Sequence, residues 1–200
     1  MKLNVPFYTQ TTLMGCGPAA LKMAVDYLGT EIKLKDIENA MGIEELKAVA
    51  TISLAGAAAK LGFNSILFTK TLDVPDEQKK MPFYQKYADS GYFNSARKRV
   101  EIAEKAGAKI NEITIDLKKL LSYVKESQAV IVLLNWAVIN HKEGFQGHFV
   151  PIVGYDETYV YVHNSGPKDP EADVKIPVAV FETARKSPGT DQDVVVISKK

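Results

Sequence analysis

Residues 10–28 read QTTLMGCGPAALKMAVDYL and hold a glutamine, the chain's only cysteine and the start of a helix. Apolar residues recur with the i, i+3, i+4, i+7 spacing of an amphipathic helix at Leu21, Ala24, Val25 and Leu28. Pro18 suits the first helical turn, and Gly29 suits the left-handed position after the last turn. We therefore predict a helix from Pro18 to Leu28, with Cys16 at its start.

Cys16 is a candidate nucleophile because of this position. A thiol reacts as the thiolate, and unpaired amide hydrogens at a helix N-terminus stabilise that anion. Gly15 and Gly17 leave room for a substrate carbonyl to approach the sulfur. The alternative is common for a lone cysteine: a small, buried apolar residue without chemistry.

Gln10 is a candidate oxyanion donor. A side-chain amide six residues before the cysteine can donate to the oxyanion that forms when a thiolate attacks a carbonyl, together with the backbone amide of Cys16. Taken alone, Gln10 fits an ordinary surface glutamine better, because glutamines are mostly exposed, and only its spacing from Cys16 favours the oxyanion role.

Three histidines are candidates for the general base that a thiol nucleophile needs. His148 opens the predicted strand Phe149–Tyr155 and so stands on a rigid element. His141 lies in a polar stretch, and His163 alternates in phase with neighbouring tyrosines, which favours a structural role. We therefore choose His148.

Asn164 is the candidate that would orient His148. Phe149–Tyr155 and Tyr159–His163 predict an antiparallel hairpin, and pairing Gly154 with Thr158 places Asn164 opposite His148 on one face. An asparagine oxygen there would select the imidazole tautomer, as in Cys-His-Asn enzymes. A pairing shifted by one would put Ser165 there instead, and Asn-Ser-Gly-Pro is also an ordinary turn sequence.

Together these segments resemble the papain-like cysteine peptidases, and most closely the peptidases that cut double-glycine leaders from bacteriocin precursors. The resemblance lies in Gln10, in the Cys16-Gly17-Pro18 helix start, in Gly147-His148-Phe149-Val150 leading to Gly154-Tyr155-Asp156, and in Asn164 after the second strand. It implies Cys16 as nucleophile, His148 as base, Asn164 as orienting residue and Gln10 as oxyanion donor. Two departures are Gly15, where the family usually has an acidic residue, and Asn164-Ser165, where it typically has Asp-Pro.

The remaining chain predicts an α+β fold, with a helical N-terminal half packed on an antiparallel β-sheet from the C-terminal half. The length of 200 residues fits one domain, 1–200. Further elements predicted along the chain are helices at 34–41 and 53–61, strands at 63–69, 129–134 and 194–198, and a helix capped by Asp116. The run Ala129–Leu134 is typical of a central strand covered on both faces.

Residues 73–107 are expected to form a helical insertion of about two helices divided by Gly91. Its aromatic residues either line a substrate groove or form a lid, or else they belong to the core: Phe83, Tyr84, Tyr87, Tyr92 and Phe93. Trp136, after the central strand, either borders the cleft or packs beside it.

The composition limits the partners, location and cofactors that we expect for the protein. A net charge of +1 gives no electrostatic reason to expect nucleic acid or an anionic membrane as a partner. The N-terminus shows no signal peptide, and no apolar run approaches the roughly 20 residues of a membrane span, so we expect a cytoplasmic protein. One cysteine permits no intrachain disulfide and no paired-cysteine metal site, and we expect no cofactor.

The expected function is cleavage of a peptide or amide bond through a Cys16 acyl-enzyme, with a peptide or amide-containing substrate. Two alternatives stay open. An acyl or peptidyl transferase would use the same thioester with a different acceptor, and a non-catalytic peptide-binding module would retain only the fold.

Overall fold

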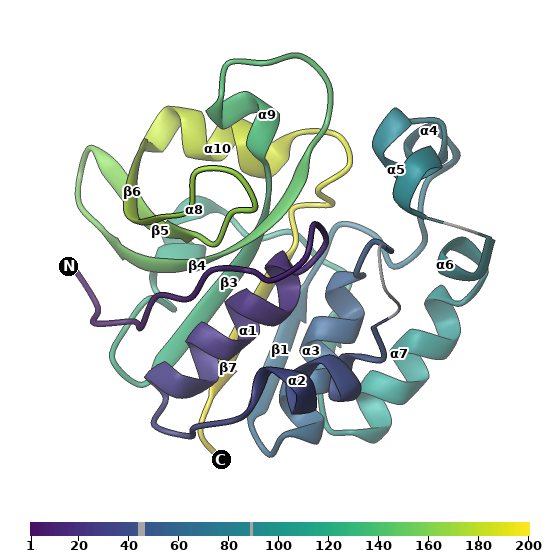
Figure 1. The fold of residues 1–200 in the computed structure, drawn as a ribbon, viewed down its shortest axis with the longest axis horizontal. Helices are drawn as coiled ribbons and strands as arrows, with labels where there is room; N and C mark the ends of the chain where they lie inside the picture. The colour runs from purple at the N-terminus through teal and green to yellow at the C-terminus, as the bar shows by residue number, and fades with distance from the viewer. Residues whose placement is uncertain (44–46, 89) are drawn as a thin grey trace.

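The computed structural model describes residues 1–43, 47–88 and 90–200. Its strands form a seven-stranded sheet in the order β2-β1-β7-β3-β4-β5-β6 (Figure 1), antiparallel except for the pair β1 and β2. The strands are β1 (Asn64–Phe68), β2 (Lys109–Asn111), β3 (Gln128–Asn135), β4 (Gly147–Tyr155), β5 (Tyr159–Asn164), β6 (Glu171–Pro177) and β7 (Val194–Ser198).

Helices cover both faces of the sheet. The core on one face joins the strands to α1 (Cys16–Tyr27), α2 (Leu34–Met41), α3 (Thr51–Lys60) and α7 (Ala96–Lys105). The core on the other face joins them to α8 (Leu117–Leu121), α9 (Trp136–Ile139) and α10 (Val178–Lys186). Three short helices, α4 (Asp76–Lys79), α5 (Pro82–Tyr87) and α6 (Ser90–Asn94), lie beyond β1 on the way to α7 (Figure 1).

The central strand β3 shows why the sheet lies between two cores. Ala129, Ile131 and Leu133 face α1 and α3, whereas Val130, Val132 and Leu134 face α8 and α10. All six are buried, so apolar residues are needed at consecutive positions and the strand shows no alternation of polarity. The prediction of a central strand covered on both faces is confirmed.

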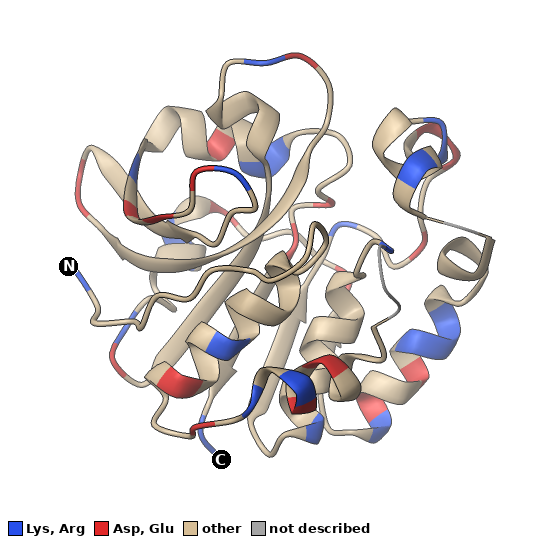
Figure 2. Ribbon diagram, in the orientation of Figure 1, with Lys and Arg blue, Asp and Glu red and all other residues tan. Residues whose placement is uncertain are grey.

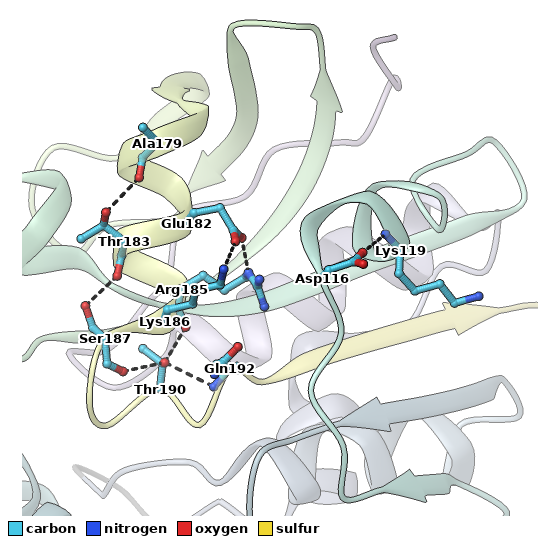
Figure 3. Close-up of polar contacts among 10 residues, drawn as sticks. All are labelled: Asp116, Lys119, Ala179, Glu182, Thr183, Arg185, Lys186, Ser187, Thr190 and Gln192. Atoms are coloured by element: carbon cyan, nitrogen blue, oxygen red, sulfur yellow. Dashed lines mark hydrogen bonds and ion pairs between the residues drawn. The ribbon is translucent and has the colours of Figure 1, made fainter.

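The predicted helices around the cysteine are confirmed, with small shifts at their ends. α1 begins at Cys16, two residues before Pro18. Gly29 and Gly62 have φ of 79° and 96°, the left-handed conformation that ends a helix without a Cβ clash. Asp116 caps α8 by accepting a hydrogen bond from the Lys119 amide at 2.7 Å (Figure 3).

Other expectations need correction. The described residues of 73–107 form four helical segments, and Gly91 lies inside α6 where a divider between two helices was expected. The sheet also includes β1 from the N-terminal half. Four elements were not predicted: β2, β6, α9 and α10. β6 is mostly exposed and includes three charged residues, and β2 and α9 are only three and four residues long, so these three carry no strong hydrophobic period. α10 is a nine-residue amphipathic helix that the sequence analysis missed.

The end of α10 is held to the loop that precedes β7. Thr190 Oγ1 donates to the carbonyls of Arg185 and Ser187 at 2.6 and 2.8 Å, and the Gln192 amide donates to Thr190 Oγ1 (Figure 3). These hydrogen bonds fix the short loop 189–193 between the helix and the strand.

Charged side chains lie on the outer helices and loops, and both signs are interspersed (Figure 2). The inner strands β1, β3, β4 and β7 contain no charged residue. Among the described residues no helix is long and apolar enough to cross a membrane.

Candidate active site

Cys16 lies at the first position of α1, with its side chain against strand β4. The residue is 9% exposed, and the backbone amides of Phe149, Gly17 and Cys16 itself are placed to donate to the sulfur. Burial raises the pKa of the Cys16 thiol, and those three amides oppose the rise only in part. The resting side chain is therefore a neutral thiol that needs a base to become nucleophilic.

His148 precedes Phe149 on β4, so the base candidate lies one residue along the strand from the backbone amide that faces the Cys16 sulfur. Its ring is buried, 4% exposed, and stands edge-to-face against Trp136 with ring centroids 4.9 Å apart. Burial lowers the pKa of His148 to about 4, although its hydrogen bond with Asn164 acts in the opposite direction. At neutral pH the imidazole is uncharged and can accept a proton.

Asn164 fixes which nitrogen of His148 carries the hydrogen. His148 Nε2 lies 3.0 Å from Asn164 Oδ1. The amide orientation of Asn164 follows from its other contacts, because Nδ2 donates to the Asp169 carbonyl and Oδ1 accepts from the Gly166 amide. Since Oδ1 can only accept, Nε2 must donate, and Nδ1 is left as the basic atom.

The predicted hairpin register is wrong, but Asn164 and His148 still lie on the same face of the sheet. Gly154 pairs with Tyr161 and not with Thr158, a shift of three that would turn Asn164 to the opposite face from His148. A bulge between Ile152 and Gly154 changes the shift to two, because Ile152 pairs with Val162. An even shift keeps both residues on one face, where they meet diagonally.

Gln10 lies beside the loop that carries Ser165, but its side-chain amide is already hydrogen-bonded. Nε2 donates to the carbonyls of Thr12 and Leu13 at 2.8 and 3.0 Å, which uses both amide hydrogens. The side-chain oxygen Oε1 accepts from Ser165 Oγ, and the backbone amide of Gln10 donates to the Ser165 carbonyl. Gln10 therefore ties the loop before Cys16 to the strand end that carries Asn164, and one amide hydrogen would have to leave its carbonyl to reach an oxyanion.

The other two histidines lie apart from this group. His163 is buried, its Nε2 is 3.0 Å from the Val5 carbonyl, and its Nδ1 accepts from the Asp173 amide, which confirms the expected structural role. His141 is exposed in the turn after α9 and has a φ of 54°. Neither shares a hydrogen bond with Cys16, His148 or Asn164 among the contacts of the described residues.

A cavity of about 70 Å³ lies beside Cys16. It is lined by Cys16, Gly147 and Phe149 on the side of the thiol, and by Phe83, Tyr84 and Tyr92 from the segment 73–107. Phe83 and Tyr84 also contact Phe145, with ring centroids 5.2 and 5.7 Å apart. Three of the five aromatic residues named from the sequence thus border the cavity, and Tyr84 is at the same time buried in the packing.

Asp193 had no signal in the sequence, whereas Trp136 and Ser165 were named there without these contacts. Trp136 packs on the His148 ring, Ser165 Oγ donates to Gln10 Oε1, and Asp193 lines the cavity from the position before β7. Asp193 stands in the polar stretch TDQD directly before the strand, which looks like an ordinary surface turn.

Solved structures share this fold. A C39-like peptidase from Bacillus anthracis matches with a TM-score of 0.61 and 18% identity over 100% of this chain and 98% of that one. A double glycine motif protease from an AMS/PCAT transporter, in complex with its leader peptide, matches with a TM-score of 0.56 and 15% identity, over 100% and 94%. The peptidase domain of Streptococcus ComA, a bifunctional ABC transporter, matches with a TM-score of 0.55 and 12% identity, over 98% and 100%. The predicted papain-like fold, similar to the leader peptidases, is confirmed.

A family model matches nearly the whole chain as well. The model described as guanylylate cyclase covers residues 5–197, and this range includes Gln10, Cys16, His148 and Asn164. The sequence resemblance to leader peptidases did not predict this family. On this match, the chain belongs to the family described as guanylylate cyclase.

Proposed function

We propose that the protein is a cysteine peptidase or amidohydrolase that cleaves a peptide or amide bond through an acyl-enzyme on Cys16. The observation that carries the proposal is the His148–Asn164 hydrogen bond, because an amide of fixed orientation leaves Nδ1 of a neutral imidazole free to take a proton. A neutral imidazole held in this tautomer is the kind of base that the Cys16 thiol requires.

The reaction has two stages, acylation of Cys16 and hydrolysis of the thioester. His148 Nδ1 takes the proton of the Cys16 thiol as Sγ bonds to the substrate carbonyl carbon, and the carbonyl oxygen becomes the oxyanion. The oxyanion re-forms the carbonyl, the carbon–nitrogen bond breaks, and His148 gives the proton to the leaving amine. A water molecule then attacks the thioester, its proton passes through His148 to sulfur, and the acid leaves.

Oxyanion stabilisation falls to the backbone amide of Cys16 and to Gln10. The Cys16 amide stands at the first turn of a 12-residue helix, where the helix dipole favours negative charge. Gln10 would contribute when one hydrogen turns from a loop carbonyl to the oxyanion, which requires a local rearrangement of residues 12–13.

The test compares the wild-type protein with Cys16→Ala on peptide and acyl-amide libraries, with products identified by mass spectrometry. Products formed by the wild type and absent with Cys16→Ala support the proposal. Adding amine acceptors separates the two thioester reactions, because a transferase would form an amide with the acceptor in place of the free acid. If both proteins leave every substrate intact but retain one of the peptides on a column, the chain is a binding module.

The family description supplies a second candidate, the conversion of GTP to cyclic GMP and pyrophosphate. The cavity beside Cys16 is lined largely by apolar and aromatic side chains, and the guanidinium of Arg99 in its lining already donates to the Tyr92 carbonyl and Ser95 Oγ instead of facing a phosphate group. We therefore place this activity second. Incubation with GTP and Mg²⁺ tests it, and cyclic GMP formed equally by wild type and Cys16→Ala would favour it over the hydrolase.

A further inference from the structure

The cavity beside Cys16 extends across the sheet to two aspartates. Cys16 contacts Phe149 on β4, Phe149 pairs with Leu133 on β3, and the Leu133 amide donates to the Asp193 carbonyl at 3.2 Å. These steps cross two strand spacings, a backbone distance of about 10 Å. Cys16 and Asp193 both line the cavity, so a group extending from the reacting carbonyl by the length of a long side chain would reach the carboxylate.

The side chains that line the cavity between Cys16 and Asp193 are largely apolar, whereas two carboxylates lie at the end away from Cys16. Leu67, Leu133, Phe83, Phe145 and Phe149 line the cavity, together with Asp191 and Asp193. Such a lining suits a long aliphatic chain that ends in a polar group, because the methylenes lose contact with water while the end group keeps hydrogen bonds.

Asp193 has an unused acceptor. It is 7% exposed, Thr51 Oγ1 donates to Oδ2, and Oδ1 has no hydrogen-bond partner among the described residues. The Thr69 hydroxyl nearby donates to the Thr71 carbonyl at 2.8 Å. A buried carboxylate oxygen without a donor is costly, and a donor brought by a ligand would remove that cost. Holding the start of α3 through Thr51 uses only Oδ2, so that structural role leaves Oδ1 unexplained.

The charge around Asp193 is negative. Burial, with the neighbouring carboxylate Asp191, raises the pKa of Asp193 to about 7, while the hydroxyls of Thr51 and Thr69 act in the opposite direction. Neither aspartate forms an ion pair with another part of the chain that the structure describes. Arg99 also lines the cavity. Its terminal nitrogens donate to the Tyr92 carbonyl and to Ser95 Oγ within the segment 73–107, and its Nε has no hydrogen-bond partner among the described residues.

We propose that the cavity is a specificity subsite for a cationic side chain of the substrate, with Asp193 Oδ1 accepting from its ammonium or guanidinium group and Asp191 adding negative charge. The inference rests on the proposed function, since the bound group is taken to belong to the substrate of Cys16. A long basic residue beside the scissile bond is the substrate class that this subsite selects.

The test uses thiol alkylation, which requires no hydrolysis. The probes are N-(4-aminobutyl)-2-chloroacetamide and its uncharged counterpart N-pentyl-2-chloroacetamide. In both reactions the Cys16 thiolate displaces chloride and forms a thioether, followed by mass spectrometry at pH 8.5. We expect the rate ratio of cationic to neutral probe to exceed the ratio for free 2-mercaptoethanol by about tenfold, and to fall to the free-thiol ratio in Asp193→Asn.

Controls keep the result decisive. Asp76→Asn removes an equal charge from an exposed carboxylate on α4 and should retain the wild-type ratio. Asp191→Asn should lower the rate ratio of cationic to neutral probe several-fold. This variant replaces Asp193→Asn as the test if Asp193→Asn does not fold. A wild-type ratio equal to that of the free thiol, an unchanged ratio in Asp193→Asn, or failure of either probe to reach Cys16 overturns the subsite. A cationic preference without any hydrolysis would leave the subsite standing and refute the proposed function.

Discussion

His148 Nε2 and Asn164 Oδ1 lie 3.0 Å apart although the two residues are not directly opposite in the β4–β5 ladder. The bulge between Ile152 and Gly154 changes the register by one, and this change alone returns Asn164 to the face of His148. The contact therefore depends on an irregularity in the strand.

Asn164→Ala should lower the rate of Cys16-dependent hydrolysis by on the order of ten- to a hundredfold, because the imidazole loses the acceptor that fixes its tautomer. The measurement is kcat on a substrate identified with the libraries. Asn39→Ala, at an exposed position of α2, is the matched control and should leave kcat unchanged. An Asn164→Ala protein that is folded and fully active would contradict the orienting role.

Gln10→Glu should lower kcat by on the order of a hundredfold with a smaller change in KM, because a carboxylate cannot donate to an oxyanion that exists only in the transition state. The same change also removes the donors to the Thr12 and Leu13 carbonyls. A change in thermal stability with kcat preserved would assign Gln10 to the loop alone.

His148 should make the protein less stable in acid. Its pKa is about 4 in the folded protein and near 6.5 when unfolded, so the unfolded chain binds a proton first as the pH falls. Stability is complete above pH 6.5 and declines toward pH 4, by about 3 kcal/mol for this group. Urea unfolding at pH 7 and pH 4.5 should show this loss in the wild type but not in His148→Gln.

Asp193 should make the protein more stable in acid, opposite to the effect of His148. Its pKa is raised to about 7 in the folded protein, so the folded state binds a proton first as the pH falls. The wild type should lose up to about 4 kcal/mol as the pH rises from 4 to 7, relative to Asp193→Asn, which has no such proton to lose. Equal pH profiles of the two proteins in urea unfolding would show that the carboxyl is not perturbed.

Gly56→Ala should destabilise the protein even though alanine favours helices. A Cβ at position 56 of α3 would lie 3.0 Å from Ala103 Cβ and 3.1 Å from Ala103 Cα on α7. The crowding should cost about 1–3 kcal/mol and exceed the helix-propensity gain of roughly 1 kcal/mol. Adding Ala103→Gly relieves the side-chain overlap, so the double variant should recover part of the melting temperature.

Local patterns in the sequence were sufficient for the elements around the thiol. The helix of Cys16, the helix at 34–41, the Asp116 cap and the buried strand β3 all follow from hydrophobic period, capping residues and glycine conformation, which act over a few neighbouring positions. The glutamine, cysteine, histidine and asparagine were also chosen from the sequence as site candidates, on spacing, residue chemistry and the expected hairpin, and their catalytic roles stay predictions.

The register and the cavity were decided only by the tertiary structure. No residue in the hairpin predicts the bulge that brings Asn164 to His148, because the register depends on how the whole of β4 pairs with β5. Asp193 and the aromatic residues of 73–107 are separated by about a hundred positions, and they meet only when α10 and its loop return β7 to the middle of the sheet. Burial then changes their chemistry: the residue types Cys16, His148 and Asp193 come from the sequence, but their shifted pKa values come from the loss of water around them.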